Sequence, residues 1–490
     1  MTQGHRPDTV AQPALWLIAG RGVGFLAAFI VPLVLVRVFE QATFGTYKQL
    51  FLIYATLFGV AQIGVAESLY YFVPRDPSTA GRYASNAVIT LAAAGIASIV
   101  LLGGASESIA QWLTNAQLAD TLVPLGVFLA LMLTSAIAEI VLVSRRQYET
   151  AAYAYATSDI ARAAFVLVPA IAIGTLQSVL WGAVAFAATR LIVMLWYFFR
   201  TFNTHFRPSL ALWRSQWVYT LPFALAVGIE VVQGNVHHYV VASRFDPATF
   251  AIYAVGCLQI PLVDVMATSA ANVMMVKMAE NGFDTRGSAA LALWHDTMSR
   301  LAMVIVPLTI FLLIMARDII VTLFTASYLA SVPIFMLWTL TIVSFVPCID
   351  AMLRVHAQTR FLFGLNLLRL ALVLGLTTWF LSWYGLSGAV LVVLISTFVV
   401  RIIGLVRIAR LLDTGLATVL PWARLTTTAV CSVIAAVPTM WFANSTALPR
   451  PLVLACAVGL YAATYVVLCY GLGRFPLRAA PAPVLQDVSL

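Results

Sequence analysis

Three arginines embedded in apolar runs are the residues of this sequence best suited to binding chemistry. Arg21, Arg162 and Arg369 each lie inside a long apolar segment. An ionisable group in such a segment is costly and by default marks a functional path. A guanidinium stays charged in a low dielectric and can donate two parallel hydrogen bonds to a phosphate. We therefore interpret these arginines as candidate binding residues for an anionic substrate.

Each of these arginines also has a structural explanation. Arg21 is one or two turns from the start of its segment, so its side chain could extend to the inner membrane surface. Arg162 follows Asp159 by three residues on one helical face, which predicts an internal ion pair. Arg369 lies deeper, where a buried pair with an acid is the alternative. Arg190 and Arg401 can both be structural partners of other residues.

Acidic residues in other apolar segments are candidates for ion coupling. Glu230, Asp264 and Glu67 could each bind a proton or Na⁺ that drives a transport cycle. The alternative for Glu230 and Asp264 is a salt bridge with one of the arginines. For Glu67, near the inner end of its segment, the alternative is a surface position.

Other familiar kinds of site are not predicted. His237 and His238 are adjacent, so they should point to different helix faces and make a poor metal pair. The five cysteines form no CxxC pair, and no Ser/His/Asp arrangement stands out. We therefore expect no catalytic residues, no metal and no cofactor, and a transporter rather than an enzyme.

The composition determines which elements must position these charges. The 490 residues are 62% hydrophobic and only 10% charged, with a mean hydropathy of +0.95, whereas a soluble domain carries about a quarter charged residues. Apolar runs of about 20 residues match the length that a helix needs to cross a bilayer. The sequence predicts an all-α polytopic membrane protein with about 14 transmembrane helices. Their approximate centres are Ala27, Leu57, Ala94, Leu131, Phe165, Ala187, Glu230, Asp264, Pro307, Trp338, Leu372, Val393, Ile434 and Tyr461.

The distribution of basic residues predicts the orientation of these helices. The net charge is +9, but the basic residues are scattered singly between apolar runs, so nucleic acid is not an expected partner. With the N-terminus placed inside, the inner segments hold 18 Lys and Arg and the outer segments hold 5. This bias predicts a multi-pass membrane protein with both termini in the cytoplasm. We expect no cleaved signal peptide.

An internal repeat predicts the domain organisation. The stretch 39–47 (FEQATFGTY) matches 245–253 (FDPATFAIY) at a spacing of 206 residues, and 180–184 (LWGAV) matches 386–390 (LSGAV) at the same spacing. A unit of six spans predicts two lobes in parallel orientation that face each other across a cavity. The predicted parts are an N-terminal lobe (1–200), a cytoplasmic amphipathic linker (201–217), a C-terminal lobe (218–412), two extra spans (413–475) and a cytoplasmic tail (476–490).

Several of these segments resemble one transporter family. The stretches 20–37 and 43–47 (TFGTY), together with 68–75 (SLYYFVPR), resemble bacterial polysaccharide exporters of the Wzx type. These are oligosaccharide-lipid flippases of the multidrug/oligosaccharidyl-lipid/polysaccharide exporter superfamily. Pro307, Leu323, Phe324 and Tyr328 fit the same pattern, although the family usually has a glycine near position 326, where this chain has Ala326.

The resemblance implies a flippase that moves a polyprenyl-pyrophosphate-linked oligosaccharide across the cytoplasmic membrane by alternating access. The product would serve exopolysaccharide, capsule or O-antigen (lipopolysaccharide) synthesis. Expected partners are the lipid-linked glycan, membrane lipids and polysaccharide polymerase machinery. The alternatives are a lipid II flippase for cell-wall synthesis and a multidrug exporter of the same superfamily. A membrane polymerase or ligase is disfavoured because the predicted outer loops are short.

Overall fold

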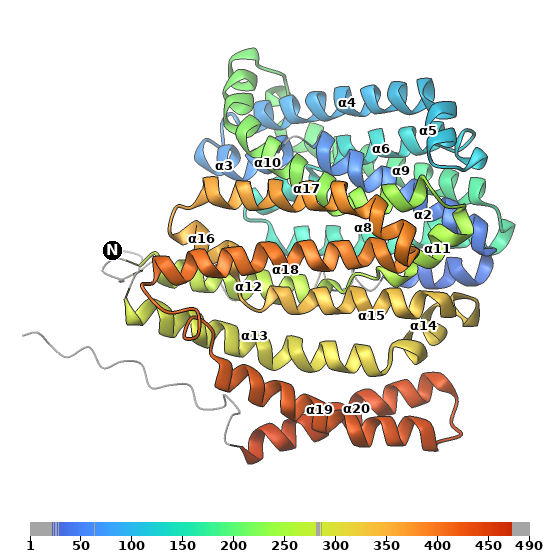
Figure 1. The fold of residues 1–490 in the computed structure, drawn as a ribbon. Helices are drawn as coiled ribbons and strands as arrows, with labels where there is room; N and C mark the ends of the chain where they lie inside the picture. Colours follow the sequence, from blue (N-terminus) through green and yellow to red (C-terminus); the bar gives the residue numbers. More distant parts are fainter. Residues whose placement is uncertain are drawn as a thin grey trace, which may run out of the picture. The chain divides into compact units, whose positions relative to one another are not determined.

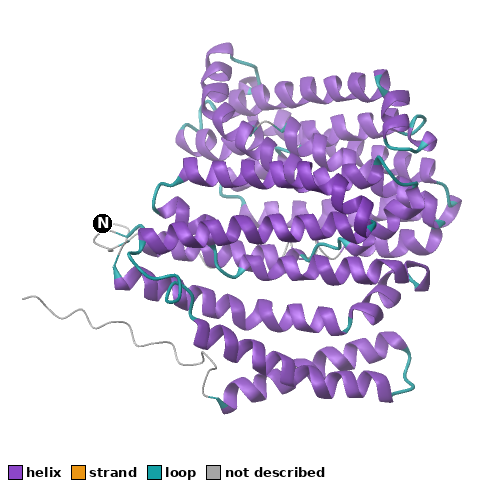
Figure 2. Ribbon diagram, in the orientation of Figure 1, coloured by secondary structure: helices purple, strands orange, loops and turns teal. Residues whose placement is uncertain are grey.

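The computed structural model describes residues 22, 24, 27, 29–62, 64–280, 285 and 287–472. Within these residues the chain forms helices joined by short connections, and no strand occurs (Figures 1 and 2). In a bilayer no water is available to satisfy exposed backbone groups, so helices that bond their own backbone are favoured. The prediction of an all-α polytopic membrane protein is confirmed. Arg21 and the predicted tail (476–490) lie outside the described residues.

Ten of the described helical segments are long and apolar enough to cross a membrane. An eleventh results if α2 (Gln41–Ala61) and α3 (Val65–Arg75), which are bent by 41° at their junction, form one span. All fourteen predicted span centres fall on helical residues. The three centres beyond these eleven lie in a first helix that is only partly described, in α10 (Leu210–Ala242), and in α12 (Pro261–Met278), which follows the short α11 (Pro247–Gly256).

The helices group into two compact units. The first unit comprises residues 1–257 and 366–393, and the second comprises 258–365 and 394–490. Besides α2, α3, α10 and α11, the first unit contains α4 (Ala80–Gly104), α5 (Ser106–Trp112), α6 (Leu122–Ser135), α7 (Ala138–Ser144), α8 (Tyr148–Ile173) and α9 (Leu176–Phe202), the 3₁₀ turns η1 (Ala116–Leu118) and η2 (Asn203–His205), and most of α17 (Thr359–Tyr384).

The second unit begins with α12 and ends with the last two helices of the chain. It contains α13 (Ser288–Ile314), α14 (Ala316–Phe324), η3 (Ala326–Ser331), α15 (Val332–Leu340), η4 (Thr341–Phe345), α16 (Ile349–Val355), most of α18 (Leu386–Leu411), α19 (Trp422–Ser445) and α20 (Arg450–Gly471). Within it α19 and α20 pack on each other and on α13, with Tyr465 donating to the carbonyl of Met303 at 3.0 Å. These units group the chain differently from the lobes predicted at 1–200 and 218–412, and those lobe boundaries stay a prediction.

Helices α2 and α11, which carry the matched segments 39–47 and 245–253, pack against each other within the first unit. A Cβ on Gly45 would lie 1.7 Å from the carbonyl oxygen of Pro247, so only glycine permits this approach. Phe44, Phe250 and Tyr253 are at most 1% exposed. The sequence motif that carries the family resemblance therefore builds a helix–helix contact.

The segment predicted as a surface linker (201–217) continues into the following helix. Residues 210–217 are the first part of α10, and they are tied to neighbouring helices by hydrogen bonds. The indole of Trp213 donates to the hydroxyl of Thr90 at 3.0 Å, and the amide of Gln216 donates to the hydroxyl of Ser68 at 2.8 Å. Trp213 and Gln216 thus bind α4 and α3, whereas Arg214 beside them is exposed, and the linker at 201–217 stays a prediction.

Backbone features of the two halves recur at a spacing of 211 residues. Positive φ angles occur at Thr114 and Thr325, at Arg146 and Ala357, and at Gly174 and Gly385, each pair 211 positions apart. By contrast α2 and α11 begin 206 residues apart. Between these two sets of positions lies a connection of unequal length, since nine residues separate α12 from α13, whereas four separate α3 from α4.

This change of spacing corrects the second sequence match. Leu180 lies six residues after Gly174, whereas Leu386 directly follows Gly385, so 180–184 and 386–390 occupy different helical positions. They resemble each other for a local reason. A Cβ on Gly182 would lie 2.1 Å from the carbonyl oxygen of Phe165, and one on Gly388 would lie 2.1 Å from that of Phe380. Each glycine allows its helix to touch the preceding one.

Candidate functional site

A buried ion pair joins α7 to α9 in the first unit. Arg190 donates to both carboxylate oxygens of Glu139, at 2.9 and 2.8 Å, and the two side chains are 18% and 7% exposed. The pair lines a pocket of about 380 Å³ between α7, α8 and α9. Thr157, Ser158 and Thr189 add hydroxyl groups to its wall. A charge inside a membrane-length helix is stabilised by such a partner, so Arg190 has the structural role expected of it.

A second ion pair lies on α8. Arg162 and Asp159 are 2.9 Å apart, and their side chains are 35% and 27% exposed. This confirms the ion pair predicted from their spacing. A Cβ on Gly24 would lie 2.0 Å from a carboxylate oxygen of Asp159, so the first helix approaches α8 at this pair. The partly exposed guanidinium of Arg162 retains donors for a further anion.

An aromatic row on α2 accompanies these charges. Tyr47, Phe51, Tyr54 and Phe58 follow one another along one helical stripe with ring centroids 4.5 to 5.8 Å apart. Arg162 is an electrostatic neighbour of Tyr47 and Tyr54, and Arg190 is one of Tyr54. Aromatic faces and phenol hydroxyls beside guanidinium groups can contact the apolar and polar parts of a ligand together.

A third group of charges lies on α2, α10 and α17. Arg369 on α17 is half-buried and is an electrostatic neighbour of His237 on α10. Lys48 on α2 stands in the same relation to His238. Lys48 lies in the second turn of α2.

The two histidines also lie closer together than expected. Their ring centroids are 4.1 Å apart, and donor atoms of His237, His238 and Cys257 all lie within 4.8 Å of one another. The expectation that the two rings diverge is therefore wrong. Cys257, directly after the end of α11 at Gly256, reaches the same pair. His237 Nδ1 is 2.7 Å from the hydroxyl of Tyr253. The cationic neighbours Lys48 and Arg369 favour an anion over a metal cation here.

The three predicted ion-coupling residues are all exposed, and they lie on separate helices. Glu230 is on α10, Glu67 is on α3 and Asp264 is on α12. Glu230 and Glu67 belong to the first unit and Asp264 to the second. None of the three forms an ion pair with a described arginine or lysine. An exposed carboxylate on a spanning helix is stable only where it faces water or a polar cavity.

The second unit repeats the ion pair of the first. Arg401 donates to Asp350 at 2.9 Å, and both residues lie 211 positions after Arg190 and Glu139. Arg401 is therefore a structural partner, as predicted. Asp350 is 47% exposed, whereas Glu139 is 7% exposed. The two halves thus share an architecture but differ in how deeply the acid is buried.

Comparison with known proteins decides the family. Residues 34–333 match the family model described as polysaccharide biosynthesis protein. The chain belongs to this family. The matched region runs from the first helix into α15, and it contains both ion pairs and the aromatic row of the first unit but not Arg369. No curated protein matched the chain.

Solved structures show which fold the family member adopts. A lipid II flippase, MurJ, in an inward closed conformation matches with a TM-score of 0.71 at 13% identity, over 95% of this chain and 100% of that chain. A multidrug resistance MATE transporter of the MOP superfamily, inward-facing, matches at 0.60 and 15% identity, over 82% and 96%. A MOP superfamily transporter from Pyrococcus furiosus matches at 0.59 and 13%, over 82% and 95%. At these identities the likeness shows the fold alone.

Proposed function

We propose that this protein is a flippase that moves a polyprenyl-pyrophosphate-linked oligosaccharide from the inner to the outer leaflet by alternating access. The match of residues 34–333 to the polysaccharide biosynthesis family carries the proposal. The fold supports it, since it is shared with a lipid II flippase and with MATE transporters. The proposal implies a transporter without catalytic activity that lies in the cytoplasmic membrane with both termini in the cytoplasm. The transported glycan is used for exopolysaccharide, capsule or O-antigen synthesis.

The side chains of the first unit suit such a substrate. A pyrophosphate must exchange water for donors on entering a membrane cavity, and Arg162, Arg369 and Lys48 supply cationic donors there. Arg21, which lies outside the described residues, is a fourth cation in this proposal. The row Tyr47, Phe51, Tyr54 and Phe58 supplies aromatic faces for sugar rings or isoprenoid chain. We assign substrate binding to Arg21, Arg162 and Arg369.

Ion coupling is assigned to Glu230, Asp264 and Glu67. Their exposed carboxylates are available to a proton or Na⁺, unlike the acids held in ion pairs. In this proposal the ion drives the cycle, no other cofactor is needed, and a polysaccharide polymerase receives the glycan.

Lipid II is the second candidate substrate, and one observation favours it. The lipid II flippase matches 95% of this chain, whereas the MATE transporters match about 82%. Both substrates are polyprenyl-pyrophosphate glycans, so the same cations would serve either. The multidrug exporter is less favoured because the first unit presents arginines where organic cations would need acids.

A strain that lacks this protein tests the proposal. We expect this strain to accumulate a polyprenyl-pyrophosphate oligosaccharide that stays on the cytoplasmic leaflet. The normal chain should clear the accumulation, and so should the control Arg410→Ala, which changes an exposed arginine. Arg369→Ala should not clear it, and Arg369→Lys should clear it in part because it keeps the charge without the planar fork.

Two outcomes would overturn the assignment. Unchanged lipid-linked glycans together with altered drug sensitivity would identify a drug exporter. Rescue of a strain depleted of its lipid II flippase, without any effect on other glycans, would identify lipid II as the substrate. In each assay immunoblotting of membranes shows that the variant chains are present.

A further inference from the structure

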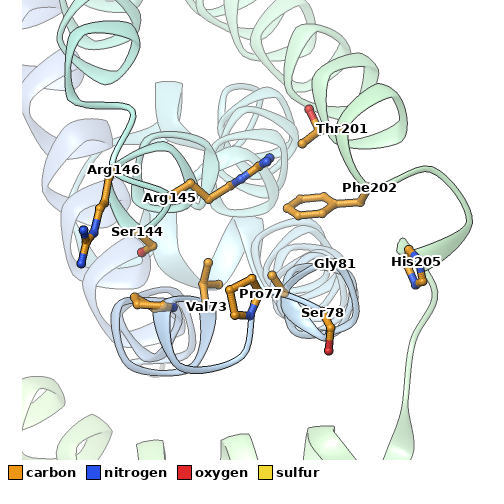
Figure 3. Close-up of a pocket in the computed structure, with 12 residues that line it drawn as sticks. Val73, Pro77, Ser78, Gly81, Ser144, Arg145, Arg146, Thr201, Phe202 and His205 are labelled. Carbon is orange, nitrogen blue, oxygen red and sulfur yellow. The ribbon is translucent and has the colours of Figure 1, made fainter. Parts of the chain in front are cut away.

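A pocket of about 530 Å³ opens at one end of the first unit, away from the ion pairs described above. Its walls come from the end of α3 and the turn after it, the start of α4, the turn between α7 and α8, and the end of α9 with η2. Figure 3 shows Arg145 and Arg146 on one wall, with Phe202 and His205 on the other. Nothing in the proposed transport cycle uses these residues.

The pocket is basic. Arg145 and Arg146 line it, and none of its lining residues is acidic. Neither arginine takes part in an ion pair within the described part of the chain. The nearby Asp76 is already occupied, because its carboxylate accepts hydrogen bonds from the hydroxyls of Ser78 and Thr79 at 2.6 and 2.8 Å. Both guanidinium groups therefore remain available to an anion.

Aromatic packing holds one of these arginines in place. The guanidinium of Arg145 lies over the ring of Phe202, 5.2 Å from its centroid, and Figure 3 shows the side chain extended toward that ring. Phe202 is itself only 8% exposed, so the ring is fixed by its neighbours. Such stacking orients a guanidinium while leaving its N–H donors free at the rim.

A buried hydroxyl in the same pocket has no partner. Ser144 is 8% exposed, it lines the pocket, and its Oγ makes no hydrogen bond in the described structure. A buried polar group without a partner costs free energy, which a ligand atom can recover. The N-terminal turn of α4 adds Ala80 and Gly81 to the wall, and no side chain caps this helix by a hydrogen bond. The positive end of a helix favours an anion.

Comparison of the two halves shows that the turn does not need these arginines. Residues 211 positions after Arg145 and Arg146 are His356 and Ala357. Ala357 adopts the same left-handed conformation as Arg146, with φ angles of 54° and 61°. His356 Nε2 instead lies 2.9 Å from the carbonyl oxygen of Thr285. The backbone is therefore conserved between the halves while the two positive charges are particular to the first.

We propose that this pocket binds the phosphate of an anionic membrane phospholipid. Basic pockets between helix ends at the cytoplasmic surface suit such headgroups, and the proposed orientation puts this end of the unit in the cytoplasm. A membrane lipid is favoured over a soluble phosphate by the neighbouring face of α9. Trp196 and Phe199 are 60% and 58% exposed there, and Arg200 lies over the Trp196 ring, as in an interfacial aromatic belt.

Native mass spectrometry of the purified full-length protein tests this assignment. The protein is titrated in detergent with phosphatidylglycerol or with phosphatidylcholine, and bound lipid is counted. We expect phosphatidylglycerol to bind preferentially, and Arg145→Ala/Arg146→Ala to weaken it about 30-fold if each arginine acts as in a basic surface segment. Ser144→Ala should weaken it less. The matched control is Arg410→Ala/Arg424→Ala, which removes two exposed arginines elsewhere and should bind as the normal protein does.

Two results would overturn the proposal. Equal phosphatidylglycerol binding by the Arg145/Arg146 variant and the control would show that the pocket is not the lipid site. The other result is that micromolar inorganic pyrophosphate displaces the lipid from the normal protein and fails to bind the Arg145/Arg146 variant. That result would assign the pocket to a soluble or substrate phosphate. Thermal unfolding shows whether the variants are folded. The assay measures binding alone, so it can fail or succeed independently of flippase activity.

Discussion

Arg190 binds both carboxylate oxygens of Glu139, and the same relationship recurs 211 residues later between Arg401 and Asp350. In each case an acid near the end of one span meets an arginine on the second helix that follows it. The first acid is 7% exposed and the second 47%. Equivalent positions of the repeat are therefore in different environments, and this difference is measurable.

Arg190→Ala should destabilise the protein more than Arg401→Ala. Removing Arg190 leaves the carboxylate of Glu139 buried without a partner, which costs about 3–5 kcal/mol. Removing Arg401 exposes an acid that is already near water, which costs about 1 kcal/mol or less. Thermal unfolding in detergent measures both variants. Glu139→Gln combined with Arg190→Gln should recover part of the loss, and equal losses for the two single variants would contradict the burial difference.

Gly45→Ala should be strongly destabilising. The added Cβ would meet the backbone carbonyl of Pro247 at 1.7 Å, and α2 and α11 would have to separate. Forcing extra volume into a packed contact typically costs about 1–3 kcal/mol. The control is Gly459→Ala in α20, where nothing lies within 4 Å and alanine favours the helix. Comparable unfolding temperatures for the two variants would show that the α2–α11 contact is not tight.

Asp246→Ala should cost about 1 kcal/mol of stability. The carboxylate of Asp246 accepts a hydrogen bond from the amide of Thr249 at 3.0 Å and caps α11, and this bond lowers the pKa of Asp246. Glu40 occupies the equivalent position before α2 but makes no such bond. Glu40→Ala is the matched control and should have little effect. Chemical unfolding in detergent measures the free energy of unfolding of both variants. Asp246→Asn should be about as stable as the normal protein, because asparagine also caps helices.

The turn between α3 and α4 should respond to acid. Hydrogen bonds from the hydroxyls of Ser78 and Thr79 lower the pKa of Asp76 in the folded protein. A lowered pKa contributes stability that is present above the ordinary aspartate value, near 3.9, and that is lost as the pH falls through the folded value.

Asp76→Ala and the normal protein should therefore differ in unfolding temperature at neutral pH and converge as the pH falls below about 4. The comparison is made in detergent between pH 3 and 7. A difference that grows toward low pH would contradict the assigned sign. Asp120→Ala, for which no hydrogen bond is described, is the control.

Much of the architecture follows from the sequence because membrane physics leaves few choices. A span needs a long apolar run, so the centres at Ala94, Leu131 and Phe165 could be located by hydropathy alone, and each lies in a long helix. The pair Asp159–Arg162 was predictable because residues three apart share a helix face. The repeat was visible at 39–47 and 245–253, where tight packing around Gly45 restricts the residue types.

Tertiary structure alone decided which distant groups meet. Glu139 and Arg190 are 51 residues apart, and nothing in either segment specifies the rotation that turns their side chains together. The change of spacing from 206 to 211 arises after the segments 39–47 and 245–253, so it cannot be read from them. The basic pocket is assembled from three separate connections, so its arginines look in sequence like ordinary inner-surface charges. The periodicity of a helix determines which of its residues share a face, whereas the packing of helices determines which faces contact each other.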